Sequence, residues 1–259
     1  MRLIDSHCHL SHGRLRNQLD AVLTRAREAG LVGLVCAAGD LQESEASAEI
    51  AALNEDVYCM AGVHPHDAKD VPGDYLDCIE RLAKRPGNVA IGEVGLDYHY
   101  DYSPRQDQQR VFSEQLALAR KLAKPIVVHT REAFEDTMAI LSESGVIGTD
   151  VVFHSFTGGP EQARSALNMG AAISFSGIVT FSKASEVRQA AKLVPSERLL
   201  IETDAPFLSP EPVRKMKTNE PANVAHVAAF LAKLFGLKTK QLAEKTTANA
   251  ATFFRLGLS

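Results

Sequence analysis

Pro125-Ile126-Val127-Val128-His129 and Asp150-Val151-Val152-Phe153-His154 are the two segments that decide the fold. Each contains an uninterrupted apolar run and ends in a histidine. A strand with one solvated face alternates apolar and polar residues, whereas a strand buried on both faces, as in a parallel sheet covered by helices, is apolar throughout. Both segments therefore predict central strands of a parallel sheet.

The same pattern recurs along the chain. Six further apolar runs predict strands at Arg2–His7, Val32–Ala38, Val57–Val63, Val89–Glu93, Ala171–Ser176 and Leu199–Thr203. Stretches with apolar residues at three- and four-residue spacing, such as Leu15–Ala29 and Arg105–Leu122, lie between the runs and predict helices. Strands that alternate with helices predict a parallel sheet, and eight such units in 259 residues favour closure into an α/β (β/α)₈ TIM barrel.

Two further features bear on the fold. The first predicted strand is followed by His7-Cys8-His9 and not by a glycine-rich dinucleotide fingerprint, which argues against an open Rossmann sheet. After residue 221 the pattern predicts a last barrel helix and a C-terminal cap made of Val224–Phe235, Thr239–Lys245 and Ala248–Leu256. We therefore expect one hydrolase domain over residues 1–259, a TIM barrel with C-terminal helices.

Net charge, apolar runs and cysteine spacing bear on the binding partners and the cellular compartment of the protein. The net charge of −4 argues against tight binding of nucleic acid through a wholly basic face. No signal peptide opens the chain, and no apolar run reaches the ~18 residues that cross a bilayer. The four cysteines lack CxxC spacing and are expected to be buried free thiols of a reducing compartment. We expect a cytoplasmic protein with no membrane association and no stable protein partner.

Imidazoles and carboxylates stand at the carboxyl ends of the predicted strands. In chain order, the residues at these ends are His7, His9, His64, Glu93, His129, His154 and Asp204. The active site of a TIM barrel lies at this face, and these side chains are the ligands that zinc, manganese and similar divalent ions prefer. The pattern predicts a metal centre whose ligands are His7, His9, Glu93, His129, His154 and Asp204.

The number of ligands indicates two ions. A single catalytic zinc usually takes three protein ligands and keeps one open position, so six are too many for it. Two ions about 3.5–4 Å apart could share a hydroxide, and Glu93 is best placed to bridge them. Asp204 is expected to ligate one ion and to accept a proton from the bound water. Glu202, two residues earlier, is either a hydrogen-bond partner of a ligand or part of an ordinary salt bridge.

Six motifs in this order resemble the TatD family of metal-dependent deoxyribonucleases. They span essentially the whole chain: Asp5-Ser6-His7-Cys8-His9-Leu10, Gly62-Val63-His64-Pro65-His66, Gly92-Glu93-Val94-Gly95-Leu96-Asp97-Tyr98, Pro125-Ile126-Val127-Val128-His129-Thr130-Arg131, His154-Ser155-Phe156-Thr157-Gly158 and Glu202-Thr203-Asp204-Ala205-Pro206. The resemblance implies a TIM-barrel hydrolase with two divalent ions, such as zinc, magnesium or manganese.

The resemblance also implies a division of ligands and a substrate. One ion would be held by His7, His9, Glu93 and Asp204, and the other by Glu93, His129 and His154. The implied activity is 3′→5′ exonuclease cleavage of DNA, with single strands or 3′ ends as the substrate. His64 and His66 would lie beside the ions without ligating them and could contact a phosphate or a water.

One loop departs from the family pattern. Many relatives carry Arg-Gly-Lys, then Asn or Glu, then Pro-Ala after the eighth strand, whereas this chain reads Val213-Arg214-Lys215-Met216-Lys217-Thr218-Asn219-Glu220-Pro221-Ala222. The glycine is missing and three cations remain. Arg131, Arg214, Lys215 and Lys217 are candidates to bind substrate phosphates. A solvated loop is the alternative interpretation of these cations, and it is favoured for Lys217.

Three functions are candidates for a chain with these residues. In the first, metal-activated water hydrolyses a phosphodiester, with Glu93 and Asp204 as the catalytic residues. In the second, the same centre cleaves an ester or amide as amidohydrolases do, including the ester of an aminoacyl-tRNA. Many amidohydrolases bridge their ions with a carbamylated lysine, and the glutamate at this position favours the nuclease. The third, a non-catalytic binding protein, predicts missing ligands, and all six are present.

Overall fold

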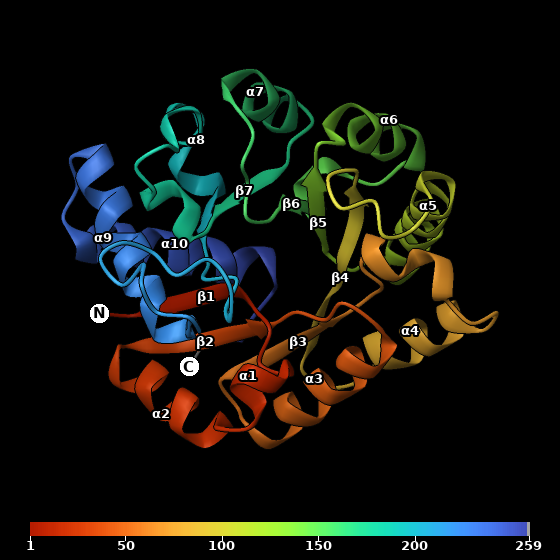
Figure 1. The fold of residues 1–259 in the computed structure, drawn as a ribbon, viewed down its shortest axis with the longest axis horizontal. Helices are drawn as coiled ribbons and strands as arrows, with labels where there is room; N and C mark the ends of the chain where they lie inside the picture. Colours follow the sequence, from red (N-terminus) through yellow and green to blue (C-terminus); the bar gives the residue numbers. More distant parts are fainter. Residues whose placement is uncertain (258–259) are drawn as a thin grey trace.

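Eight parallel strands form a nearly closed barrel in the computed structural model, which describes residues 1–257 (Figure 1). The strands pair with their neighbours in chain order. Their bounds are β1 (Leu3–Cys8), β2 (Leu31–Cys36), β3 (Val57–Ala61), β4 (Asn88–Asp97), β5 (Ile126–Arg131), β6 (Val151–Phe153), β7 (Ala172–Phe175) and β8 (Leu199–Ile201). The predicted (β/α)₈ barrel is confirmed.

Helices surround the sheet (Figure 1). The α-helices are α1 (Gly13–Arg16), α2 (Leu19–Glu28), α3 (Leu41–Leu53), α4 (Tyr75–Ala83), α5 (Arg105–Leu122), α6 (Phe134–Ser144), α7 (Pro160–Asn168), α8 (Ser185–Ala191), α9 (Val224–Phe235) and α10 (Thr239–Phe253). Short 3₁₀ turns are η1 (Pro65–Asp70), η2 (Gly148–Asp150), η3 (Gly177–Thr180), η4 (Ser196–Arg198) and η5 (Pro221–Asn223). No helix in the described part of the chain has the length and hydropathy needed to cross a membrane.

The barrel closes between the end of β1 and the segment that follows β8. The backbone N–H of His9 donates to the carbonyl oxygen of Ala205 at 2.7 Å, and that of Asp204 donates to the carbonyl oxygen of His7 at 2.9 Å. Both bonds lie at the carboxyl ends of the strands. They therefore fix the first and last predicted metal ligands against each other.

Alternate strand residues build two apolar layers. One residue from each strand points into the barrel: Ile4, Val35, Met60, Ala90, Val127, Val152, Ala172 and Leu200. Neighbours such as Ile126 and Val128 belong to the larger core between the sheet and the helices. This double burial is the reason why the strands are apolar throughout.

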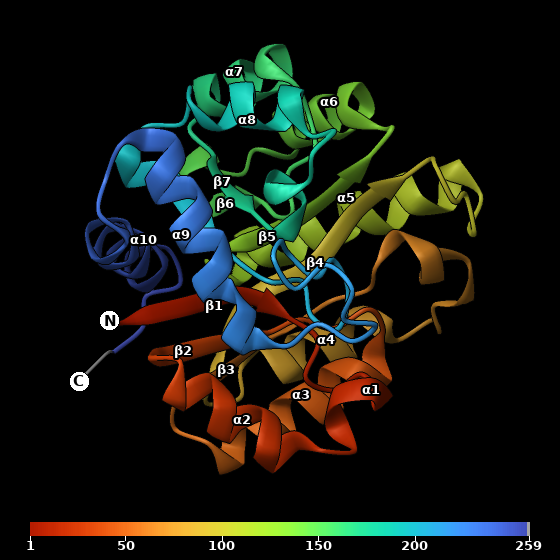
Figure 2. The ribbon, with the colours of Figure 1, turned by 60° about the vertical axis from the view of Figure 1, so that its left-hand side comes forward.

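Helix α10 closes the amino-terminal end of the barrel. Its Ala250 and the following Phe254 join the inward-facing cluster. The Thr247 hydroxyl donates to the carbonyl of Arg2 at 3.1 Å, and the Asn249 amide donates to that of Leu199 at 2.8 Å. Figure 2 shows α9 and α10 beside β1. With this end blocked, the carboxyl ends of the strands form the open face.

The structure corrects several predicted element boundaries; β5, for example, continues past His129 to Arg131, and β3 and β8 each end two residues earlier than predicted. Strand β4 runs past Glu93 to Asp97, because its last residues pair with β5 as far as Arg131. The C-terminal cap is one helix and not two, since Thr239–Phe253 contains no glycine or proline that would end the helix at the threonines. The predicted helix Leu15–Ala29 is interrupted after α1 and resumes as α2.

Candidate metal centre

The predicted ligands line one cavity at the open face of the barrel. The cavity has a volume of about 610 Å³ and is bordered by the loops that follow the strands. Its walls include five of the six predicted ligands, together with His64, His66 and Arg131. The sixth, His7, is fully buried behind them at the end of β1.

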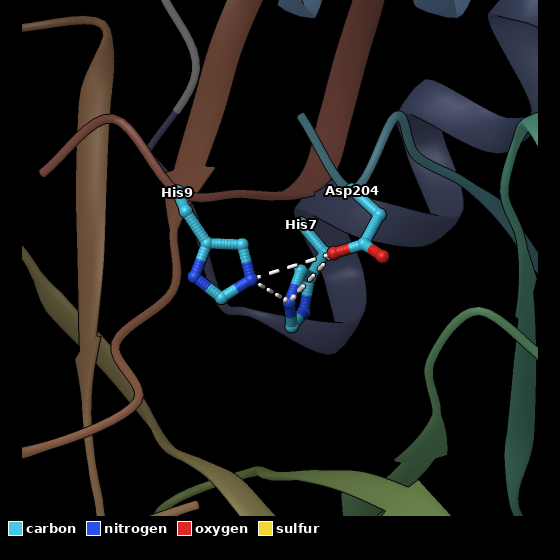
Figure 3. A group of neighbouring side chains, drawn as sticks. All are labelled: His7, His9 and Asp204. Atoms are coloured by element: carbon cyan, nitrogen blue, oxygen red, sulfur yellow. Dashed lines mark hydrogen bonds and ion pairs between the residues drawn. The ribbon is translucent and has the colours of Figure 1, made fainter. Parts of the chain in front are cut away.

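The first group of ligands comes from β1 and from the segment after β8 (Figure 3). The Nε2 atoms of His7 and His9 are 3.2 Å apart, and Asp204 Oδ1 lies 3.8 Å from the first and 3.4 Å from the second. Glu93 Oε2 lies 3.3 Å from His7 Nε2. Two atoms that ligate one tetrahedral ion at about 2.0–2.2 Å are roughly 3.3–3.6 Å apart, so this group fits a divalent ion.

The second group lies on the other side of Glu93. Its Oε1 atom is 2.9 Å from His129 Nδ1 and 2.7 Å from His154 Nε2. The two imidazole nitrogens are 3.3 Å apart. The 3.3 Å between the imidazole nitrogens matches ligands that share one ion, whereas the two contacts with Glu93 are at hydrogen-bond distance and would have to lengthen around an ion.

Glu93 is the residue common to both groups. One carboxylate oxygen faces His7 and His9, and the other faces His129 and His154. Its side chain is only 4% exposed. Burial opposes its ionisation, but the surrounding imidazoles outweigh burial and hold the pKa of Glu93 well below its ordinary value. An ionised carboxylate is the form that can bridge two cations.

Two buried carboxylates orient the histidines of the second group. Asp97 Oδ2 accepts from His129 Nε2 at 3.1 Å, and Glu202 Oε1 accepts from His154 Nδ1 at 3.2 Å. Each bond leaves the other ring nitrogen facing Glu93, as metal-ligating histidines require. Although burial opposes protonation, the carboxylates outweigh it and raise the pKa of His129 and of His154.

Sequence reasoning missed the role of Asp97 and of Asp5. Asp5 accepts hydrogen bonds from the backbone N–H and the hydroxyl of Thr203 and from the backbone N–H of His7. It thus joins β1 to the segment that carries Asp204. Both aspartates stand in quoted motifs, and Asp5 also lies two residues before His7 on the same side of the strand, a signal that could have identified it. Glu202, left open from the sequence, is a hydrogen-bond partner of the predicted ligand His154.

His64 is held as a donor to the bridging carboxylate. Its Nδ1 accepts from the backbone N–H of His66, so the ring proton lies on Nε2, which is 3.4 Å from Glu93 Oε1. Burial lowers the pKa of His64 to about 4, which keeps the ring neutral. His64, Glu93 and His129 also form a group whose ligand atoms lie close enough to hold an ion, so the place of His64 beside the ions without ligating them stays a prediction. His66 lies farther out and donates to Asp97 Oδ2 at 3.0 Å.

The residues predicted to bind substrate phosphates lie in different parts of the structure. Arg131, at the end of β5, lines the cavity, and its guanidinium lies 4.7 Å above the ring of Tyr100. The guanidinium of Arg214 lies 3.5 Å above the ring of Phe181. Neither Arg214 nor Lys215 is among the described residues that line the cavity. The structure thus brings Arg131, but not the loop cations, to the ligand cluster.

The glycines beside Glu93 permit close strand packing. Gly95 has a φ of +142°, and a Cβ atom there would lie 1.9 Å from the carbonyl oxygen of His129. A Cβ atom at Gly92 would lie 2.8 Å from Cβ of Val127. Side chains at either position would push β4 away from β5 and separate Glu93 from His129.

Comparison with known proteins identifies the family. The model of the family described as TatD related DNase matches residues 4–255. The chain belongs to the TatD family. The uncharacterized metal-dependent hydrolase YcfH of Escherichia coli K12 is 41% identical, and the match covers all of this chain and 98% of that protein. The 3′-5′ ssDNA/RNA exonuclease TatD of Klebsiella pneumoniae strain 342 is 35% identical over 99% of each chain.

A solved TatD homologue has the same fold throughout. The crystal structure of YJJV from Escherichia coli K12 matches this TatD chain with a TM-score of 0.92 at 27% identity, over 98% of each chain. Family membership makes the protein a metal-dependent hydrolase. The predicted resemblance is confirmed, and the non-catalytic reading is set aside.

Replacing Asp97 by asparagine is expected to weaken metal binding to this TatD protein by ~10–100-fold. The Oδ1 atom of the new amide can still accept from the backbone N–H of His99 and Tyr100, as the Asp97 carboxylate does now. The amide nitrogen takes the place of the oxygen that accepts from His129, so that ring loses its orientation. Titration against a competing chelator measures the affinity.

Asp101 provides the matched control for this substitution. Its side chain is 45% exposed and lies in the loop that follows β4, four residues after Asp97. Asp101→Asn should bind metal as the wild type does. Wild-type affinity in Asp97→Asn would show that the carboxylate does not position His129.

Proposed function

We propose that the protein is a 3′→5′ exonuclease that hydrolyses phosphodiester bonds of DNA with two divalent ions. The observation that carries the proposal is the division of Glu93 between two imidazole pairs. The ligands proposed for the first ion are His7, His9, Glu93 and Asp204, and those for the second are Glu93, His129 and His154. Bound there, the ions would lower the pKa of a water and neutralise charge on a phosphate.

Asp204 is the proposed proton acceptor. Its Oδ1 atom faces His9, and the other oxygen points away from both imidazoles (Figure 3). Burial opposes its ionisation, but the hydrogen bond from His9 and the charge of nearby imidazoles outweigh burial and lower the pKa of Asp204. The carboxylate is therefore ionised at neutral pH and ready to accept a proton.

Three further observations support a nucleic-acid substrate. The exonuclease of Klebsiella pneumoniae is similar in sequence to this protein over 99% of this chain. A cavity of about 610 Å³ has the size of a small-molecule site, which suits the end of one strand better than a duplex. Arg131 supplies a cation at the wall of this cavity, where a phosphate next to the scissile one could lie. We propose the same role in phosphate binding for His66, and a weaker, peripheral one for Arg214 and Lys215.

Degradation of end-labelled single-stranded DNA tests the proposal. A 5′-labelled oligonucleotide with Mg²⁺, Mn²⁺ or Zn²⁺ should yield a ladder of products shortened from the 3′ end, and EDTA should abolish it. A phosphorothioate linkage at the 3′ end should block the ladder. Metal-dependent turnover of an aminoacyl-tRNA or of p-nitrophenyl acetate, with intact DNA, would contradict the proposal and favour the ester hydrolase.

A further inference from the structure

Two exposed aromatic side chains stand at opposite sides of the metal centre. Tyr100 follows β4 and is 47% exposed, and Phe207 follows β8 and is 41% exposed. Both line the cavity. Because β4 and β8 are four strands apart in the eight-stranded barrel, the two rings flank the ligand cluster from opposite sides.

A continuous row of rings joins these two side chains. Consecutive ring centroids lie 3.9–6.4 Å apart, in the order Phe207, His9, His7, His154, His129, His66 and Tyr100. The inner five rings are histidines of the centre and its neighbour, and the outer two are exposed. A chain bound across the ions would thus meet an aromatic surface on each side.

Core packing does not account for Phe207. Its backbone is fixed, since its N–H donates to the carbonyl of Asp204 at 2.9 Å and its carbonyl accepts from the Asn219 amide at 2.7 Å. The ring makes T-shaped contacts with His9 and His12, and 41% of the residue is exposed. Because the ring lines the cavity beside the predicted ligands, a ligand bound there could cover its exposed part and gain apolar burial.

Tyr100 belongs to a stack that ends in a cation. Its ring stacks on Tyr102 at 5.3 Å with 26° between the planes, and the guanidinium of Arg131 lies over it. An arginine laid on an aromatic ring presents a flat, charged surface on which a nucleobase can stack. The stack thus offers the cavity a second base-sized face.

The charge of the cavity shows why stacking is needed. Arg131 is its only lysine or arginine among the described residues, whereas five carboxylates line it, those of Glu43, Asp67, Glu93, Asp97 and Asp204. Even with two divalent ions in place, few cations remain to hold the rest of a polyanion. Proteins that bind single strands without a strong positive groove gain affinity from bases stacked on aromatic rings.

We propose that Phe207 and the Arg131–Tyr100 stack hold two nucleobases of a single strand, one on each side of the ions. This inference rests on the proposed function and names its substrate: a strand with unpaired bases at its end. A base-paired end presents no free base face, so both surfaces select single strands. The affinity should also depend weakly on salt, because one arginine releases few counterions.

Binding of a cleavage-resistant strand tests the inference separately from catalysis. The probe is a fluorescein-labelled phosphorothioate oligothymidylate, and its partner probe has the same backbone with abasic sites in the last two positions. Fluorescence anisotropy gives the Kd of both for the metal-loaded protein. Phe207→Ala and Tyr100→Ala should each raise the Kd of the thymidylate ~5–100-fold and change the Kd of the abasic probe little.

Ring-preserving variants separate stacking from folding. Phe207→Tyr and Tyr100→Phe should bind the thymidylate within about threefold of the wild type, and all four variants should keep the wild-type Tm and metal content. Equal losses of affinity for the two probes, or none, would overturn the inference. Stacking without any cleavage of the natural oligonucleotide would instead overturn the proposed function.

Discussion

Glu93→Ala is expected to remove the metal-binding capacity of both halves of the centre and to lower kcat/KM by on the order of 10³-fold or more. The side chain supplies one oxygen to each half, so no other ligand can replace it. Without its charge the five facing imidazoles also lose the anion that holds them together. Metal analysis after gel filtration, with turnover of single-stranded DNA, measures both effects.

Two further variants isolate the bridging role of Glu93. Glu93→Asp keeps the charge but shortens the side chain by one methylene, so it should retain one ion and lose the second. Glu55→Gln is the control, because Glu55 is exposed and is separated in sequence from the nearest predicted ligands, which are His9 before it and Glu93 after it. It should behave as the wild type. Full metal content and full turnover in Glu93→Ala would refute the bridge.

Asp204→Asn is expected to lower kcat by ~10²–10⁴-fold with a smaller effect on KM. The amide oxygen can still face His9, but it cannot accept a proton. Since the pKa of Asp204 is lowered, the wild-type carboxylate is ionised at neutral pH, and activity that needs this form is lost only as pH falls through that pKa. Single-turnover rates between pH 6 and 9 test the assignment.

The shape of the pH profile distinguishes proton transfer from metal binding. In Asp204→Asn the rate should rise with pH, because hydroxide must replace the missing base, whereas the wild-type rate should stay level from pH 6 to 9, since Asp204 is ionised over this whole range. The second ion, which Asp204 does not face, should remain in the variant. Parallel profiles for both proteins would exclude Asp204 as the proton acceptor.

The fold and the positions of the ligands could be predicted from the sequence for one physical reason. Parallel strands that are covered on both faces must be apolar, so a histidine after Ile126-Val127-Val128 indicates that the buried part of the strand ends there, although β5 itself continues to Arg131. Strand ends of a barrel meet at one face, and this brings His7, His129 and Asp204 together although they are far apart in the chain.

The contacts that hold the ligands in place were harder to predict. The sequence contains no indication that β4 continues to Asp97, because Val94–Asp97 mixes glycine with apolar and charged residues. Asp97 therefore looked like a loop residue, whereas its oxygen orients His129. The orientation of the loop cations could not be predicted from the sequence either. The guanidinium of Arg214 lies over the ring of Phe181 and not at the cavity wall, and this contact depends on tertiary packing.

A crystal structure of the protein soaked in Mn²⁺, with anomalous data collected at the manganese edge, tests the central claim most directly. We predict two anomalous peaks about 3.5–4 Å apart, with Glu93 bound to both through separate oxygens. His7, His9 and Asp204 should surround one peak, and His129 and His154 the other. A single peak that Glu93 does not touch would contradict the account.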